Sequence, residues 1–347
     1  MTTFAELTTF RVGGPVRRLV DIASIDELAA VLAEAGAGPG AEPVMVLGGG
    51  SNLLVSDAGF DGTVARMIGD GLAVIGEADD DEVHVIVEAG AAWDELVAHT
   101  VAEGWAGVEA LSGIPGSVGA TPIQNVGAYG QEVADVITAV RTWDRETGAE
   151  RRFAPADCGF AYRDSLFKRT SRYVVTAVEF RLTAGGQGSP VRYAELARAL
   201  GVDVGSTAPV AAVREAVLGL RRSKGMVLDA ADHDTWSAGS FFTNPILSNA
   251  VAAAALPDDA PRYPAGEGLL KTSAAWLIEH AGFTKGFGAD LNGGRATLST
   301  KHTLALTNRG TASADDLLTL ARAVRAGVVD RFGIELHHEP VLVGHTL

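Results

Sequence analysis

The sequence has little of several features that define whole classes of protein. It contains one cysteine, Cys158, in 347 residues, so it has neither an intramolecular disulfide nor a thiolate metal cluster. No apolar run reaches the roughly 18 residues that span a bilayer, and the first residues lack the basic and apolar pattern of a signal peptide. We therefore expect a cytoplasmic protein that does not enter a membrane.

Basic residues are also scarce. The chain has 28 Lys and Arg against 43 Asp and Glu, a formal net charge of −15. This balance argues against nucleic acid or an anionic membrane as the main partner, although basic residues gathered locally still bind small anions. No metal site is expected, because His337 and His338 are adjacent and would point to opposite faces of a strand, and neither HExxH nor a Cys/His spacing occurs.

Glycine, by contrast, is abundant, above all in the segment 113–132, GIPGSVGATPIQNVGAYGQE. Its glycines and two prolines leave no room for a helix or a regular strand, yet it carries almost no charge. Glycine allows positive φ and a close approach of main-chain N–H groups to a ligand, and such groups bind phosphate without lysine. An ordinary surface loop is the alternative, but this segment holds apolar residues between its glycines. We therefore predict a buried cofactor loop.

Hydrophobic periodicity predicts strands mixed with helices. Gly48, Gly49 and Gly50 follow a strand but lead into the apolar segment 53–55 instead of a helix, so they do not form a Rossmann turn. The segment 184–190, AGGQGSP, is typical of a flexible connection, and we expect a domain boundary near residue 220. The predicted strands are 16–22, 44–47, 83–88, 136–143, 173–182 and 303–307, and the predicted helices are 25–35, 93–103, 194–200, 210–220, 273–281 and 313–332.

Six motifs occur in order along the chain: TTFRVGG (8–14), LGGGSNLL (47–54), the 113–132 loop, YRDS (162–165), GSFFTNP (239–245) and EPVLVG (339–344). In this order and spacing the chain resembles the UDP-N-acetylenolpyruvoylglucosamine reductase family from end to end. The resemblance implies an α+β protein with an FAD-binding fold of the vanillyl-alcohol-oxidase type in two subdomains. These would be 1–68, joined by a returning strand at 336–347, and 69–219, followed by an α+β substrate-binding domain at 220–335.

The resemblance also implies a reaction. The family uses FAD and NADPH to reduce UDP-N-acetylglucosamine enolpyruvate to UDP-N-acetylmuramate in peptidoglycan precursor synthesis. Adding hydride to the terminal carbon leaves electron density beside a carboxylate, which an arginine can pair with bidentately and a neutral carboxylic acid can hydrogen-bond. Arg163 and Glu339 match the family positions for these roles, and Ser240 matches the proton donor to the α-carbon. We expect a monomer.

Further residues match the family's binding positions. Tyr193 matches a tyrosine on a mobile loop of the type I branch, whereas Thr243 stands where many relatives have Lys, and STKHT (299–303) departs from the type I pattern. Neither glycine loop, 48–54 or 113–132, contains His or Cys, so FAD is expected to bind non-covalently. The cofactor positions are Gly48, Gly49, Gly50, Ser51, Asn52, Leu53, Ile114, Ser117, Gly119, Ile123, Gly127 and Arg221, and the substrate positions are Tyr129, Tyr193, Lys224 and Asn244.

Each catalytic assignment has a structural alternative. Arg163 could pair with Asp164 at the surface, Ser240 could be a turn or cap hydroxyl, and Glu339 could be an edge-strand charge. Two other function classes also stay open. A flavin oxidase of the same fold acting on an alcohol or lactone would not need these three residues together, and a non-catalytic nucleotide-binding relative would be expected to have lost some of them.

Overall fold

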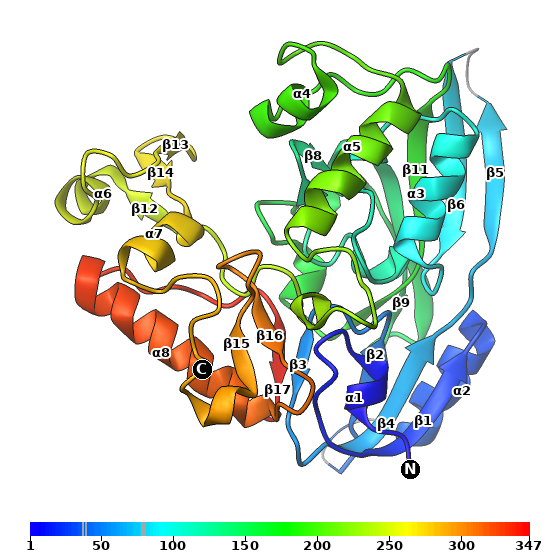
Figure 1. Ribbon diagram of the computed structural model, residues 1–347. Helices are drawn as coiled ribbons and strands as arrows, with labels where there is room; N and C mark the ends of the chain where they lie inside the picture. The colour runs from blue at the N-terminus through cyan, green and yellow to red at the C-terminus, as the bar shows by residue number, and fades with distance from the viewer. Residues whose placement is uncertain (37, 39, 78–80) are drawn as a thin grey trace. The chain divides into compact units, whose positions relative to one another are not determined.

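The computed structural model describes residues 1–36, 38, 40–77 and 81–347. These residues form two compact units (Figure 1). The first unit comprises Met1–Pro15, Ser51–Phe60 and Lys224–Leu347, and the second comprises Val16–Gly50 and Asp61–Ser223. Both units are α+β, as predicted. The glycine loop 48–54 begins in the second unit and ends in the first.

The second unit is built around a five-stranded antiparallel sheet in the order β10-β9-β11-β6-β5. Helix α3 covers one face of this sheet and buries Trp93 and Val97 against Val85 and Phe180 (Figure 1). Alternate residues of β6 point to this core, which is why the strand reads as a period-two pattern. The bounds are β5 Leu72–Glu77, β6 Glu82–Glu88, α3 Trp93–Ala102, β9 Ile137–Asp144, β10 Ala149–Phe153 and β11 Tyr173–Thr183.

A smaller sheet with the order β1-β4-β2 opens the second unit. The helix that follows its first strand, α2, begins where predicted, because the hydroxyl of Ser24 accepts the N–H of Glu27. After β2 the glycines lead into a strand, β3, and this confirms that they do not open a Rossmann helix. The bounds are β1 Val16–Ile22, α2 Ile25–Ala35, β2 Val44–Leu47, β3 Leu53–Val55 and β4 Phe60–Met67.

The segment 184–190, predicted as a flexible connection, is tied down by hydrogen bonds. The N–H of Gly186 donates to the carbonyl of Gly104, and that of Gly188 donates to the carbonyl of Ala208, each at 2.8 Å. The N–H of Ser189 donates to the buried carboxylate of Glu109 at 2.7 Å. Small residues suit this segment because its backbone lies close to its neighbours. It leads into α4 Ala194–Leu200 and α5 Val210–Ser223.

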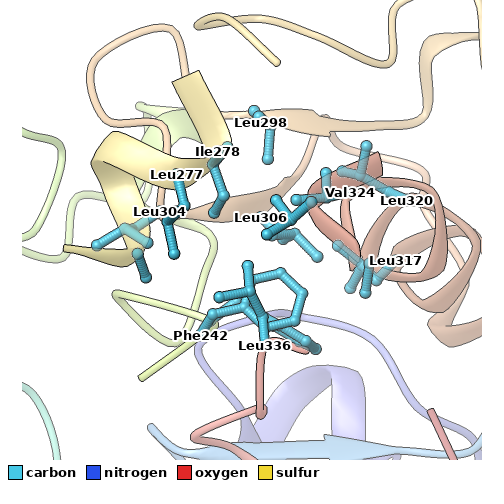
Figure 2. Packing of buried hydrophobic residues seen from close by; sticks show 14 of the residues in the cluster. Phe242, Leu277, Ile278, Leu298, Leu304, Leu306, Leu317, Leu320, Val324 and Leu336 are labelled. Carbon is cyan, nitrogen blue, oxygen red and sulfur yellow. The ribbon is translucent and has the colours of Figure 1, made fainter. Parts of the chain in front are cut away.

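The first unit has its core between a hairpin, β15-β16, and the helices α7 and α8 (Figure 2). Leu298 and Leu306 from the hairpin are fully buried, as are Leu317 and Val324 of α8. The returning strand β17 pairs in parallel with β3. The bounds are α1 Phe4–Leu7, β12 Ile246–Ser248, α6 Asn249–Ala255, β13 Tyr263–Pro264, β14 Leu269–Lys271, α7 Ala274–His280, β15 Ala296–Leu298, β16 Leu306–Asn308, α8 Ala314–Phe332 and β17 Val341–Val343.

Two further local predictions were wrong. The strand predicted at 303–307 is β16, Leu306–Asn308, because Ser299 closes a turn first: its hydroxyl accepts the N–H groups of Lys301 and His302. The 113–132 loop is not wholly irregular. It contains a short 3-10 turn, Val118–Ala120, and a two-residue hairpin formed by β7 Gly127–Ala128 and β8 Gln131–Glu132.

Candidate active site

The two glycine loops touch each other through their backbones in the second unit. A Cβ placed on Gly49 would lie 2.6 Å from the Cα of Gly116, and one on Gly48 would overlap the hydroxyl of Ser117. Close approach to backbone atoms therefore requires glycine at Gly49, whereas the neighbour of Gly48 is a side-chain hydroxyl. The contact sets the predicted cofactor positions 48–50 beside Ser117, which is 4% exposed.

The 113–132 loop is anchored where it starts. Asp94 of α3 accepts the N–H of Gly113 at 2.5 Å and pairs with both terminal nitrogens of Arg214 on α5, at 2.7 and 3.0 Å. Arg221, two turns further along the same face of α5, is buried and donates to the carbonyl of Gly113 at 3.4 Å. Burial lowers the pKa of Arg221 to about 10, so it is still a cation at neutral pH. The start of the loop therefore carries a buried positive charge.

Residues with strained backbones gather around this loop. Asn125, Tyr129 and Arg163 have φ values of +46°, +50° and +54° although none is a glycine. Residues held in the left-handed region cost of order 1 kcal/mol each and tend to cluster at functional sites. Two other non-glycine residues of the described chain, Arg11 and Asn292, also have positive φ, so this feature agrees with the predicted site without being specific to it.

Arg163 lies against the glycine loop instead of pairing with its neighbour in the sequence. Its guanidinium donates to the carbonyls of Gly127 at 2.5 Å and Asn125 at 3.4 Å. The Asp164 carboxylate pairs with Arg169, so the surface bridge between Arg163 and Asp164 is not the arrangement seen. A guanidinium fixed by main-chain carbonyls is held in one orientation, as recognition of a carboxylate requires.

Ser240 and Glu339 lie on neighbouring segments of the first unit. The N–H of Glu339 donates to the carbonyl of Phe241 at 2.8 Å, and Phe242 bridges to His338. Asn52 donates through its side chain to the carbonyl of Glu339 at 3.4 Å. Glu339 lies two residues before β17 and pairs with the Ser240 segment, so it is not on a free strand edge. The structure thus brings together the predicted proton donor, the predicted carboxylic acid and one cofactor position.

The predicted substrate residues occupy both units. Tyr129 and Tyr193 of the second unit meet edge to face with ring centroids 5.8 Å apart, and burial raises the pKa of Tyr129 to about 12. In the first unit, Lys224 begins the chain that follows α5. The side-chain oxygen of Asn244 accepts the first N–H of α7, from Ala274, at 2.9 Å, and this fixes its amide.

Sequence analysis missed the residues that hold the loop in shape. Asn125 is 1% exposed and donates to the Glu132 carboxylate and to the carbonyl of Ala161, at 2.8 and 3.1 Å. The buried hydroxyl of Ser165 donates to the carbonyl of Ile123 at 2.6 Å. Both residues stand inside motifs that were recognised. For Asn125 the available signal was a polar residue in a largely apolar, glycine-rich loop, whereas nothing distinguished Ser165 from the other polar residues of YRDS.

Neither a metal-ligand cluster nor a membrane-spanning helix occurs in the described part of the chain. Across residues 1–36, 38, 40–77 and 81–347, no three His, Cys, Asp or Glu side chains gather as metal ligands. Within the same residues, no helix is long and apolar enough to cross a membrane. Cys158 is buried, and the Cys158 thiol donates to the carbonyl of Ala154.

Comparison with known proteins establishes the family. Residues 16–154 match the model of an FAD binding domain, and residues 231–343 match the C-terminal domain of UDP-N-acetylenolpyruvoylglucosamine reductase. The reductase of Salinispora arenicola is 56% identical over 98% of this chain and 94% of its own, and that of Thermobifida fusca is 55% identical over 99% and 97%. The chain belongs to the UDP-N-acetylenolpyruvoylglucosamine reductase family. It is a flavoenzyme oxidoreductase of peptidoglycan precursor synthesis.

The fold agrees with this family. The crystal structure of the Thermus caldophilus reductase (MurB) superposes with a TM-score of 0.66 at 27% identity, covering 99% of this chain and 97% of the other. The resemblance read from the six motifs is therefore confirmed, as is the α+β fold with an FAD-binding domain.

The glycine loops fit a flavin dinucleotide. Gly48, Gly49 and Gly116 bring two stretches of bare backbone together, and the buried Arg221 supplies positive charge beside Gly113. A pyrophosphate needs this combination of accessible main-chain N–H groups and a fixed cation. The residues present are thus suited to the cofactor that the family requires.

Proposed function

We propose that the chain reduces UDP-N-acetylglucosamine enolpyruvate to UDP-N-acetylmuramate with NADPH, as a cytoplasmic monomer of the type I branch with non-covalently bound FAD. The names of its relatives support the reaction. The observation that carries it in the structure is the pairing of the Glu339 N–H with Phe241, which places Glu339 beside the segment that bears Ser240.

The residues assigned to FAD are those of the two glycine loops with Arg221. The loops contribute Gly48, Gly49, Gly50, Ser51, Asn52 and Leu53, and Ile114, Ser117, Gly119, Ile123 and Gly127. When bound, FAD takes two electrons from NADPH and delivers them as hydride to the substrate. We assign 1–68 with 336–347 and 69–219 to FAD binding, and 220–335 to substrate binding.

Three side chains are assigned to the negative charge that develops on the substrate carboxylate and to the protonation of the α-carbon. Arg163, oriented by the carbonyls of Gly127 and Asn125, binds the substrate carboxylate. Glu339 acts as a neutral acid that donates a hydrogen bond to the same group as its negative charge grows. Ser240 delivers the proton to the α-carbon, since a carbanion is basic enough to take a proton from an unactivated hydroxyl.

Four residues are assigned to the rest of the substrate. Lys224 and Asn244 bind the nucleoside diphosphate, the first as a cation and the second through the amide that Ala274 fixes. Tyr129 and Tyr193 supply phenol groups, and Tyr193, half exposed at the start of α4, closes over the ligand. We expect neither nucleic acid nor a membrane among the partners.

The proposal is tested by the absorbance spectrum of the purified protein. A yellow protein that NADPH bleaches, that the enolpyruvyl substrate recolours and that loses its flavin on denaturation supports the proposed reaction and the non-covalent FAD. Bleaching by an alcohol or a lactone, followed by recolouring with dioxygen but not with the enolpyruvyl compound, would instead support a flavin oxidase or dehydrogenase of the same fold.

A further inference from the structure

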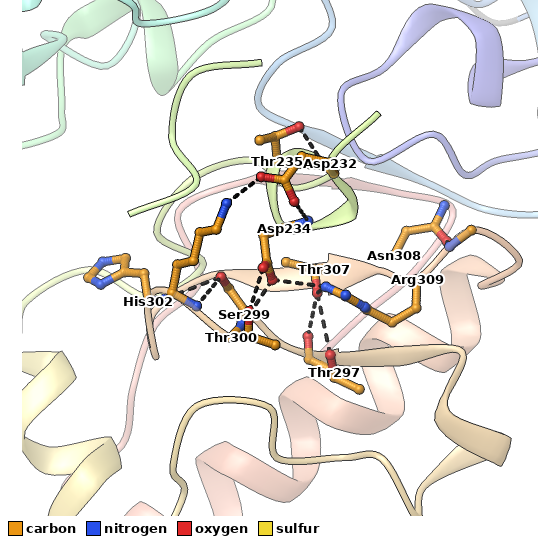
Figure 3. A network of polar contacts seen from close by, with 12 residues as sticks. Asp232, Asp234, Thr235, Thr297, Ser299, Thr300, His302, Thr307, Asn308 and Arg309 are labelled. Carbon is orange, nitrogen blue, oxygen red and sulfur yellow. Dashed lines mark hydrogen bonds and ion pairs between the residues drawn. The ribbon is translucent and has the colours of Figure 1, made fainter. Parts of the chain in front are cut away.

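A buried carboxylate in the first unit is not used by the proposed chemistry. Asp234 is 4% exposed and receives three hydrogen bonds: from the N–H of Thr300 at 2.9 Å, from the hydroxyl of Thr300 at 2.5 Å, and from Arg309 at 2.9 Å (Figure 3). Burial raises the pKa of Asp234, but the hydrogen bonds from Thr300 and Ser299 and the charge of Arg309 together outweigh this and leave the pKa below its ordinary value. Asp234 is therefore an anion with a full set of partners.

Asp234 lies at the middle of the chain that joins Lys224 to Ser240. Towards Lys224, the turn residue Gly225 (φ +66°) packs on Asp234, so that a Cβ on Gly225 would lie 3.1 Å from the Asp234 carbonyl oxygen. The carboxylate of Asp232 adds to this anchor, because it accepts the N–H of Asp234 and pairs with Lys301 at 2.5 Å (Figure 3).

Towards Ser240, the chain continues to follow the β15-β16 hairpin. The N–H of Asn308 donates to the carbonyl of Trp236 at 3.0 Å, and the N–H of Phe241 donates to the carbonyl of Leu304 at 2.8 Å. Ser237 accepts the N–H of Gly239 through its hydroxyl and so shapes the turn that presents Ser240. The hairpin thus serves as a template for the segment, and Asp234 is a buried point at which a charge fixes the segment to it, next to the more exposed pair of Asp232 and Lys301.

We propose that Asp234 is a positioning residue that fixes the distance between Lys224 and Ser240, and so matches the site to a substrate with a nucleoside diphosphate at one end and a proton-accepting carbon at the other. This inference rests on the proposed function. A displacement of about 1 Å at a reacting group can cost up to 100-fold in rate, so loosening this anchor weakens catalysis without removing any group that touches the substrate.

The test compares Asp234→Ala with Asp234→Asn. The alanine variant should raise the KM for the enolpyruvyl substrate and slow flavin reoxidation, each by about 10-fold or more, while the limiting rate of flavin reduction at saturating NADPH stays within twofold. Asparagine keeps an oxygen for the Thr300 N–H and Arg309 and an amide that can meet the Thr300 hydroxyl. It should restore most of the activity.

Asp316 provides the matched control. It is another buried aspartate of the same unit that pairs with an arginine, Arg295, at 2.8 Å, but it lies at the start of α8 and outside the chain between Lys224 and Ser240. Asp316→Ala should lower the thermal midpoint about as much as Asp234→Ala and leave the substrate KM and the reoxidation rate of the folded protein unchanged. If Asp234→Ala does not fold, Thr300→Val removes one of the three hydrogen bonds and should give the same pattern at a smaller size.

The outcomes separate the two proposals. A wild-type protein that is bleached by NADPH but not reoxidised by the enolpyruvyl substrate overturns the proposed function, and this inference with it. An active wild type whose Asp234→Ala and Thr300→Val variants keep the substrate KM and the reoxidation rate overturns the positioning role alone. Equal losses in the Asp316→Ala control also overturn it, because the effect would then be one of general stability.

Discussion

The contact between the two glycine loops gives the sharpest prediction for the cofactor site. In Gly49→Ala, the new Cβ would meet the Cα of Gly116 at 2.6 Å and its carbonyl carbon at 2.9 Å, whereas ordinary contacts begin at 3.4 Å. Both neighbours are backbone atoms, so no side chain can rotate away and the loops must separate by about 1 Å. Overpacking of this kind costs about 1–3 kcal/mol.

This cost is expected at the cofactor. If it falls on the FAD-bound form, affinity for FAD drops about 5- to 140-fold, since each 1.4 kcal/mol is a factor of ten. FAD affinity is measured by titrating the flavin-free protein and following flavin fluorescence, and flavin content by the visible absorbance of the purified protein. A general loss of stability would instead lower the thermal midpoint equally with and without excess FAD.

Gly219→Ala is the matched control. Gly219 lies inside α5, and a Cβ there meets nothing within 4 Å. The same substitution should leave FAD binding unchanged and raise stability slightly, because alanine is favoured over glycine in a helix by about 1 kcal/mol. If Gly49→Ala binds FAD as tightly as Gly219→Ala, the two loops do not form the cradle and the reasoning is wrong.

Four further predictions concern chemistry. Ser240→Ala should spare flavin reduction by NADPH but slow reoxidation by substrate by up to about 10⁴-fold; stopped-flow traces with both steps equally slowed would contradict this. Arg163→Lys should be poorly tolerated because lysine lacks the planar fork. Glu339→Gln should lower the steady-state rate less than Glu339→Ala, because an amide still donates a hydrogen bond. If Gln were as damaging as Ala while Asp stayed active, Glu339 would not act as a neutral donor. Burial raises the pKa of Cys158 from 9.0 to about 12. The contribution of the neutral Cys158 thiol to the free energy of unfolding is therefore complete below pH 9 and is lost as the pH rises towards 12. A thiol reagent at pH 8 should label Cys158 only after unfolding.

Local structure was predictable wherever neighbours in the sequence decide it. The helix Ile25–Ala35 and its Ser24 cap follow from a hydroxyl placed before an apolar repeat, and the strand β3 follows from apolar residues directly after three glycines. Motif order was sufficient for the family and for the fold with its FAD-binding domain. The roles of single site residues and the domain boundaries stay predictions.

Only the tertiary structure decided how the site is supported. Asn125 reaches Ala161, Glu339 pairs with Phe241, and Asp234 binds Thr300, and in each pair the partners are far apart along the chain. No periodicity or propensity encodes such contacts, because sheets and hairpins bring the segments together only once their cores are packed. For the same reason the glycine-rich segment 184–190 was misjudged. Its composition permits flexibility, but its hydrogen-bonding partners, Gly104 and Ala208, exist only in the folded unit.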